Sequence, residues 1–145
     1  MNVFDVAAYI LARQGSIAPM KLQKLVYYCQ AWSLVWDERP LFDEPIEAWA
    51  NSPVAPALFA VHRGMFRVDC VPGGDARGVD PRGRETIDAI LAAYGNETAY
   101  TLTAMTCRER PWRAARWPLP DGAPGSAEIP LDSIAEYYGG LVASE

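Results

Sequence analysis

The stretch that decides the fold is MKLQKLVYYCQAW, residues 20–32. Its apolar residues recur at the spacing of a helical face, and further aromatic residues widen this face. A helix with so broad an apolar surface packs on more than one side, so we expect residues 20–36 to form the central helix of the fold. Most of its aromatic side chains should then lie in the core. An alternative is that the edge formed by Lys24, Tyr27 and Gln30 is partly exposed for a partner.

Capping residues and helical periodicity predict further helices around this central one. The expected helices span residues 3–13, 19–36, 53 or 56 to 63, 85–94, 97–108, 111–117 and 131–138. Asn2 and Asn96 are the expected N-terminal caps of the first and fifth of these, and Gly139-Gly140 is the expected end of the last. Residues 71–83 and 119–128 are rich in glycine and proline, which predicts loops.

The expected fold is a single mainly α domain over residues 1–145. Its length suits one domain, and the sequence contains neither an internal repeat nor a linker that would separate two cores. We expect about six to seven short helices, with at most short extended segments such as residues 46–49.

The composition restricts the functional class. The formal net charge is −5, which disfavours a dedicated nucleic-acid binder because such proteins usually carry a basic balance. The N-terminal residues lack the basic region and cleavage site of a signal peptide. The longest uncharged apolar stretch is too short to span a bilayer. We therefore expect a cytoplasmic protein without membrane contact.

Catalytic and cofactor motifs are missing from the sequence. It contains no GxGxxG, P-loop, HExxH or GxSxG pattern, and its three cysteines show no CxxC spacing that would predict a disulfide framework or a zinc site. Cys107 and His62 could form a thiolate pair in principle, but a small buried thiol is the simpler interpretation. The acidic run from Asp37 to Glu47 lacks EF-hand spacing and predicts a solvated loop. We expect no enzymatic activity, no metal and no cofactor.

Residues 108–117, RERPWRAARW, form the one cluster in which arginines alternate with aromatic residues. The cluster contains Arg108, Arg110, Arg113 and Arg116 with Trp112 and Trp117. This composition suits a protein interface, where arginine and tryptophan concentrate binding energy. It also suits nucleic acid, through phosphate pairing and base stacking. In a third interpretation the tryptophans anchor the turn, and the arginines pair with acids such as those at 43–47.

Four segments together resemble a known family. They are MKLQKLVYYCQAW at 20–32, PLFDEPIEAWANSPVAPALF at 40–59, AYG at 93–95 and TCRERPWRAAR at 106–116. Their order and spacing resemble the Panacea domain, the SocA-like antitoxin family that includes phage-associated GepA-like proteins. The resemblance covers roughly residues 3 to 140, and it implies a mainly helical domain of bacterial and phage toxin–antitoxin pairs.

The resemblance implies that this protein neutralises a co-encoded protein toxin by direct binding. One branch of the family resembles a proteolytic adaptor that delivers its toxin to the ClpXP protease, which is the first alternative. A nucleic-acid-binding regulator that uses residues 108–117 is the second alternative. A homodimer is compatible with each of these functions.

The motif positions carried onto this chain are expected to be structural or to contact the partner. They are Lys21, Gln23, Lys24, Tyr27, Tyr28, Gln30, Glu47, Trp49, Pro53, Pro111, Trp112 and Arg116. We expect the polar ones to hold residues 40–56 and the PWRAAR turn against the central helix, with Lys21 or Lys24 paired to an acid of residues 40–56. Toxin specificity is expected on the loops at 64–84 and 118–128 and on exposed edges of helices. The candidate partner-binding surface comprises Arg108, Arg110, Arg113, Trp117, Arg67 and Arg77.

The chain departs from the family pattern at two positions. Cys107 stands where the family commonly has a histidine, which argues against shared histidine-dependent chemistry and agrees with a binding role. Ser52 stands where the family commonly has a glycine, so the backbone before Pro53 loses conformational freedom.

Overall fold

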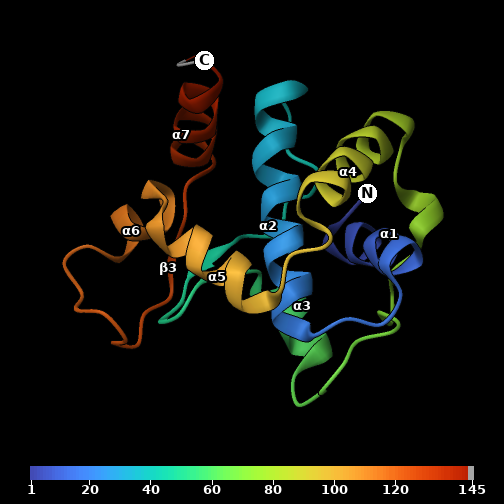
Figure 1. Ribbon diagram of the computed structural model, residues 1–145, viewed down its shortest axis with the longest axis horizontal. Helices are drawn as coiled ribbons and strands as arrows, with labels where there is room; N and C mark the ends of the chain where they lie inside the picture. Colours follow the sequence, from blue (N-terminus) through green and yellow to red (C-terminus); the bar gives the residue numbers. More distant parts are fainter. Residues whose placement is uncertain (144–145) are drawn as a thin grey trace.

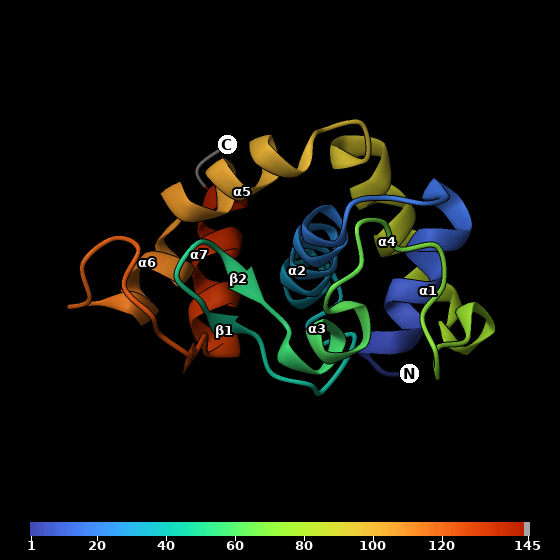
Figure 2. The ribbon, with the colours of Figure 1, turned by 90° about the horizontal axis from the view of Figure 1, so that it is seen from below.

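A helix of 18 residues, α2 (Pro19–Trp36), runs through the middle of the molecule (Figure 1). The structure, a computed structural model, describes residues 1–143. Figure 2 looks nearly along α2 and shows helices on either side of it. The helices that pack most extensively against α2 are α1 (Val3–Gln14), α4 (Pro81–Tyr94), α5 (Ala99–Arg108) and α7 (Leu131–Ala143). The prediction of a mainly α fold around a central helix is therefore confirmed.

The broad apolar surface of α2 agrees with its position in the core. It begins at Pro19, whose fixed φ suits the first position of a helix. Every residue from Leu22 to Ala31 is buried, so the helix has no solvent-facing side along this length. Lys24, Tyr27 and Gln30 are each at most 1% exposed. The alternative in which these three form a partly exposed edge is therefore wrong.

Short elements complete the fold. They are α3 (Pro56–His62), α6 (Arg110–Arg116), a 3-10 turn at Ala76–Gly78, and the strands β1 (Glu47–Ala48), β2 (Pro53–Val54) and β3 (Ala127–Glu128). The strands form an antiparallel sheet in the order β2-β1-β3, in which Glu47 pairs with both Val54 and Glu128. β1 confirms the extended segment predicted at 46–49. β3 lies in the segment predicted as a loop, held there because buried Ile129 donates its N–H to the carbonyl of Ile46.

Capping side chains decide where α1 and α5 begin. The Asn2 side chain accepts a hydrogen bond from the N–H of Asp5, whose carboxylate accepts one from the N–H of Asn2, so the predicted cap of α1 is confirmed. The predicted cap of the fifth helix is wrong. Thr98, rather than Asn96, accepts from the N–H of Thr101 and begins α5.

Two other predicted boundaries are also wrong. α4 begins at Pro81 rather than Glu85, because the Asp80 carboxylate accepts a hydrogen bond from Gly83 and caps the helix within the predicted loop. α7 continues through Gly139-Gly140 to Ala143. A glycine inside a helix costs about 1 kcal/mol relative to alanine, and the packing of α7 against α2 and α6 offsets this cost.

Candidate functional site

Two buried glutamines of α2 bind the backbone of the segment that follows the helix. The Gln30 side chain accepts a hydrogen bond from the N–H of Leu41 at 2.7 Å and donates to the carbonyl of Phe42 at 2.9 Å. The Gln23 side chain does the same with both backbone groups of Ala55. A primary amide carries both donors and acceptors, so each glutamine satisfies two buried backbone groups at once. The prediction that polar residues of α2 hold residues 40–56 is confirmed.

His62 is joined to this network through Gln23. Its Nε2 lies 2.9 Å from the amide nitrogen of Gln23. Because that nitrogen can only donate, His62 Nε2 accepts, and the ring is neutral with its proton on Nδ1. Burial lowers the pKa of His62, and the charge of Lys24 lowers this pKa further. The histidine is thus a neutral core residue, and its imidazole is engaged by α2.

Lys24 is a fully buried lysine that binds a carbonyl instead of a carboxylate. Its Nζ donates to the carbonyl of Pro53 at 2.7 Å, and burial lowers its pKa from 10.5 to about 7. Lys21, one turn earlier, donates to the carbonyl of Gly95 at 2.7 Å. The prediction that one of these lysines pairs with an acid of residues 40–56 is therefore wrong. Lys24 nevertheless binds that segment, through the backbone.

The tyrosines of α2 join α6 and α7 to the core. The Tyr28 hydroxyl donates to Glu109 Oε1 at 2.6 Å. The Tyr138 hydroxyl lies 2.9 Å from the same oxygen and 3.1 Å from the Tyr27 hydroxyl, and it forms hydrogen bonds with both. Burial raises the pKa of Glu109, although the hydrogen bonds from the tyrosines act in the opposite direction. One half-buried carboxylate thus connects α2, the start of α6 and α7.

The motif residues of α6 are bound to the small sheet. Trp112 Nε1 donates to the carbonyl of Trp49 at 3.0 Å, and the Arg116 guanidinium donates to the carbonyls of Ala48 and Ala123. Arg116 is 4% exposed and lies over the Trp112 ring. The interpretation in which the tryptophans anchor this turn is correct for Trp112. The turn reaches the central helix through Glu109 and through the sheet.

Other motif positions lie in or beside the small sheet. Trp49 Nε1 donates to Glu47 Oε1 at 2.8 Å, and Pro53 lies in β2. Among residues 1–143, Glu38 is the sole non-glycine residue with positive φ, so Ser52 needs no glycine-like backbone. The Ser52 hydroxyl is buried without a hydrogen-bond partner in this part of the chain. The departure from glycine therefore affects hydrogen bonding rather than the backbone.

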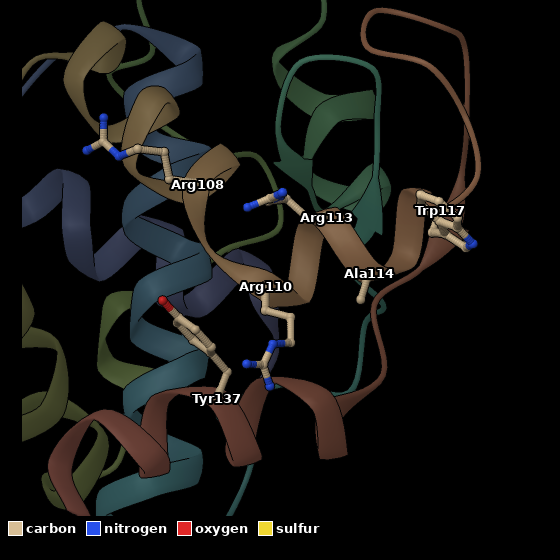
Figure 3. Close-up of a pocket in the computed structure, with 6 residues that line it drawn as sticks. All are labelled: Arg108, Arg110, Arg113, Ala114, Trp117 and Tyr137. Carbon is tan, nitrogen blue, oxygen red and sulfur yellow. The ribbon is translucent and has the colours of Figure 1, made fainter. Parts of the chain in front are cut away.

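The solvent-facing part of the cluster at 108–117 forms a groove between α5, α6 and α7. We call it the arginine groove; it has a volume of about 650 Å³ and is lined by Arg108, Arg110, Arg113, Ala114, Trp117 and Tyr137 (Figure 3). Trp117 is 83% exposed at the end of α6. Arg110 extends toward α7, and its guanidinium carbon lies 6.0 Å from the centre of the Tyr137 ring.

Arg108, Arg110 and Arg113 form no salt bridge among the described residues 1–143, although the charge of Arg108 acts on the neighbouring Glu109. The ion pairs of that range join Arg13 to Asp88, Arg39 to Asp80, Arg77 to Asp75 and Arg82 to Asp37. The interpretation in which the arginines of 108–117 pair with acids at 43–47 is therefore wrong. Arg108 and Arg113 are exposed without a salt bridge, and exposed Arg110 lies over the Tyr137 ring.

A second hollow of about 640 Å³ adjoins the arginine groove. Arg108, Arg113 and Trp117 line both, and Cys107 and Asp121 line the second. Tyr137 was not among the sequence-predicted site residues. Helical spacing in the last helix distinguishes it from the buried Tyr138, but nothing in the sequence indicates that α7 lies beside α6.

Arg67 and Arg77 lie away from the arginine groove. The Arg67 guanidinium donates to the backbone carbonyl and hydroxyl of Ser16. Arg77 pairs with Asp75 in a separate hollow that it lines with Tyr9. The structure therefore brings together four of the six residues predicted for a partner-binding surface and leaves these two apart.

Cys107 and His62 form hydrogen bonds with different residues and not with each other. Cys107 Sγ donates to the carbonyl of Asn51 at 2.9 Å, and burial raises the pKa of this thiol. His62 is bound by Gln23. Over residues 1–143 no group of three or more histidine, cysteine, aspartate or glutamate side chains is placed to hold a metal ion. The same range contains no helix that is both long and apolar enough to cross a membrane.

The comparison with known proteins identifies one family. Its model, described as antitoxin SocA-like, Panacea domain, matches residues 22–113, which is more than half of the chain. No curated protein and no solved structure matches the chain. The matched range begins in the buried part of α2 and ends at Arg113 in the arginine groove, so it includes the glutamine and lysine contacts described above. The chain belongs to the SocA-like antitoxin family with a Panacea domain.

Proposed function

We propose that this protein is a non-enzymatic antitoxin that neutralises a toxin encoded beside it by direct protein–protein binding. The family supports a role in a toxin–antitoxin system. The observation that carries the binding proposal is the arginine groove, in which three arginines that form no salt bridge among residues 1–143 lie beside an exposed Trp117. Arginine and tryptophan are the residue types that concentrate binding energy at protein interfaces.

The location of the motif residues supports this choice of surface. Gln23, Lys24 and Gln30 are buried and bind the backbone of their own chain, so a toxin cannot contact them while the domain is folded. Arg113 and Trp117 are exposed and lack such engagements. An interface of standard size buries about 800 Å² on each partner, and a groove of this volume can form its centre.

The first test is co-expression of this chain with the product of the neighbouring gene. We expect the neighbour to stop growth when it is expressed alone, and growth to return, with a stable complex, when this chain is present. Arg113→Glu with Trp117→Ala should abolish both rescue and complex formation. Arg63→Glu, an equal charge change at an exposed position of the α3 end, serves as the matched control and should leave both intact.

A proteolytic adaptor would give a different result in the same cells. The half-life of the toxin would fall when this chain is present, and rescue would be lost in cells without ClpX. Direct neutralisation predicts an unchanged toxin half-life and rescue in both strains. A neighbour that is harmless alone, or a toxin that forms no complex with this chain, would refute the antitoxin proposal.

A further inference from the structure

The arginine groove is a positive site on a negative protein. Residues 108–117 contain four arginines and one glutamate, a net charge of +3, whereas the whole chain carries −5. The remainder of the chain therefore carries −8. A ligand that fits this groove needs negative charge, because the charged side chains that line it are arginines.

The arginines of the segment fall into two groups. Arg116 is buried, and backbone carbonyls occupy its guanidinium. Arg108 and Arg113 are exposed and line both adjoining hollows, while Arg110 is held over the Tyr137 ring. The side chains of three arginines from two helices thus line one groove, and their guanidinium groups point in different directions (Figure 3). Each presents a planar fork of donors that matches a carboxylate.

The groove also offers apolar surface. Trp117 and Tyr137 stand at its sides, and Ala114 leaves space on the exposed face of α6 (Figure 3). An apolar side chain that packs here would lie between the positions of bound carboxylates. Trp117 and Tyr137 both lie beyond the range that matches the family model, whereas Arg108, Arg110 and Arg113 lie within it.

We propose, resting on the proposed function, that the arginine groove binds an acidic segment of the toxin: at least two carboxylates, which pair with Arg108 and Arg113, around one apolar side chain, which packs against Trp117 and Tyr137. The arginines supply affinity for acidic chains in general. The two aromatic residues select the apolar side chain and its spacing from the acids.

A protein segment fits these observations better than a nucleic acid. Binding to a nucleic-acid backbone grows with the number of phosphates neutralised, and this groove offers three arginines, one of them held over Tyr137, within a chain whose remaining charge is −8. Asp121 lines the adjoining hollow and would repel a phosphate chain that continued along the surface. A protein segment with mixed charges can place a neutral or basic residue at that point.

The proposal is tested with defined probes on the full chain. We would measure fluorescence anisotropy of a labelled Glu-Glu-Leu-Glu-Glu-Leu-Glu-Glu peptide, the same peptide with lysine for each glutamate, and a short oligothymidine. The acidic peptide should bind at low salt, and the basic peptide and the oligothymidine should bind at least about tenfold more weakly. Arg113→Glu should weaken acidic-peptide binding by about 10- to 100-fold, the range for loss of a charged hydrogen bond.

Two further variants test whether the peptide occupies the groove itself or is attracted by charge alone. Ala114→Phe fills the groove without a change of charge, and it should weaken the acidic peptide about tenfold or more. Arg63→Glu changes the charge elsewhere and should leave binding within about twofold. Arg113, Ala114 and Arg63 are exposed, so each variant should fold. The circular dichroism spectrum of each variant checks this.

The outcomes also distinguish this inference from the proposed function. If both Arg113→Glu and Ala114→Phe still rescue growth from the toxin, and the wild-type chain does not bind the acidic peptide, the acidic-segment proposal is overturned. The antitoxin function then stays in place. Acidic-peptide binding that is lost in both variants, in a chain that rescues no toxin, would support the groove as an acidic-segment site and refute the antitoxin. Tighter binding of oligothymidine than of the acidic peptide would overturn the inference.

Discussion

Replacing Lys24 by methionine should change how the stability of this domain depends on pH. Lys24 is fully buried, with one hydrogen bond to the carbonyl of Pro53. Burial disfavours the ammonium form and lowers the pKa of Lys24 to about 7 in the folded protein. In the unfolded chain the same group returns to its ordinary pKa of about 10.5.

The sign of the effect follows from which state binds more protons. Between about pH 7 and pH 10.5 the unfolded chain holds the Lys24 proton more often than the folded one does, so the free energy of unfolding rises with pH. One pKa unit corresponds to about 1.4 kcal/mol, and linkage then gives about 3 kcal/mol of added stability between about pH 7 and pH 9.5. Methionine lacks this titration, so the Lys24→Met variant should not share the gain.

The assay is urea denaturation of wild type and Lys24→Met at several pH values in that range. The difference between the two free energies of unfolding should grow in favour of the wild type by about 3 kcal/mol as pH rises. Titrations common to both proteins cancel in this difference. Lys21→Met, which removes a half-buried lysine of the same helix, controls for the loss of one positive charge. Parallel pH curves for wild type and Lys24→Met would refute the reasoning.

Three further predictions concern stability, each measured by urea denaturation. Gln30→Ala leaves the N–H of Leu41 without its partner and should cost more than about 2 kcal/mol; a cost below about 0.5 would show that this contact is not important. Ser52→Ala removes a buried hydroxyl without a partner and should stabilise by about 1 kcal/mol, whereas a loss of stability would indicate a partner for that hydroxyl. Tyr138→Phe removes a hydrogen bond to Glu109 and should destabilise by about 1–3 kcal/mol, with an unchanged stability as the contrary result.

Local sequence was enough to predict the elements whose signals lie within a few residues. The cap at Asn2, the proline at the start of α2 and the broad apolar face of α2 each depend on neighbours in the chain. Boundaries failed where two local signals competed. Threonine and asparagine are both favourable N-cap residues, and in the structure α5 begins after Thr98 rather than after Asn96. At Gly139-Gly140 the packing of α7 overcame a local tendency to stop.

The partners of the polar residues required the tertiary structure. The sequence indicates that Lys24 and Gln30 differ from ordinary surface residues, because they interrupt an apolar helix. It does not indicate that Lys24 meets the carbonyl of Pro53, because backbone carbonyls are present at every position and carry no sequence signal. The positive charge of Lys24 led us to expect an acidic partner, but its partner in the structure is the backbone carbonyl of Pro53.

The sequence by itself determined the fold class, the family and the presence of an arginine-rich segment, because periodicity, motif order and local charge are properties of the linear chain. The tertiary structure alone decided which of those arginines remain open. It buried Arg116 against the sheet, left Arg113 exposed, and brought Tyr137 of α7 beside α6 to form a groove. A binding surface assembled from distant segments depends on helix packing, which side-chain contacts across the whole domain determine.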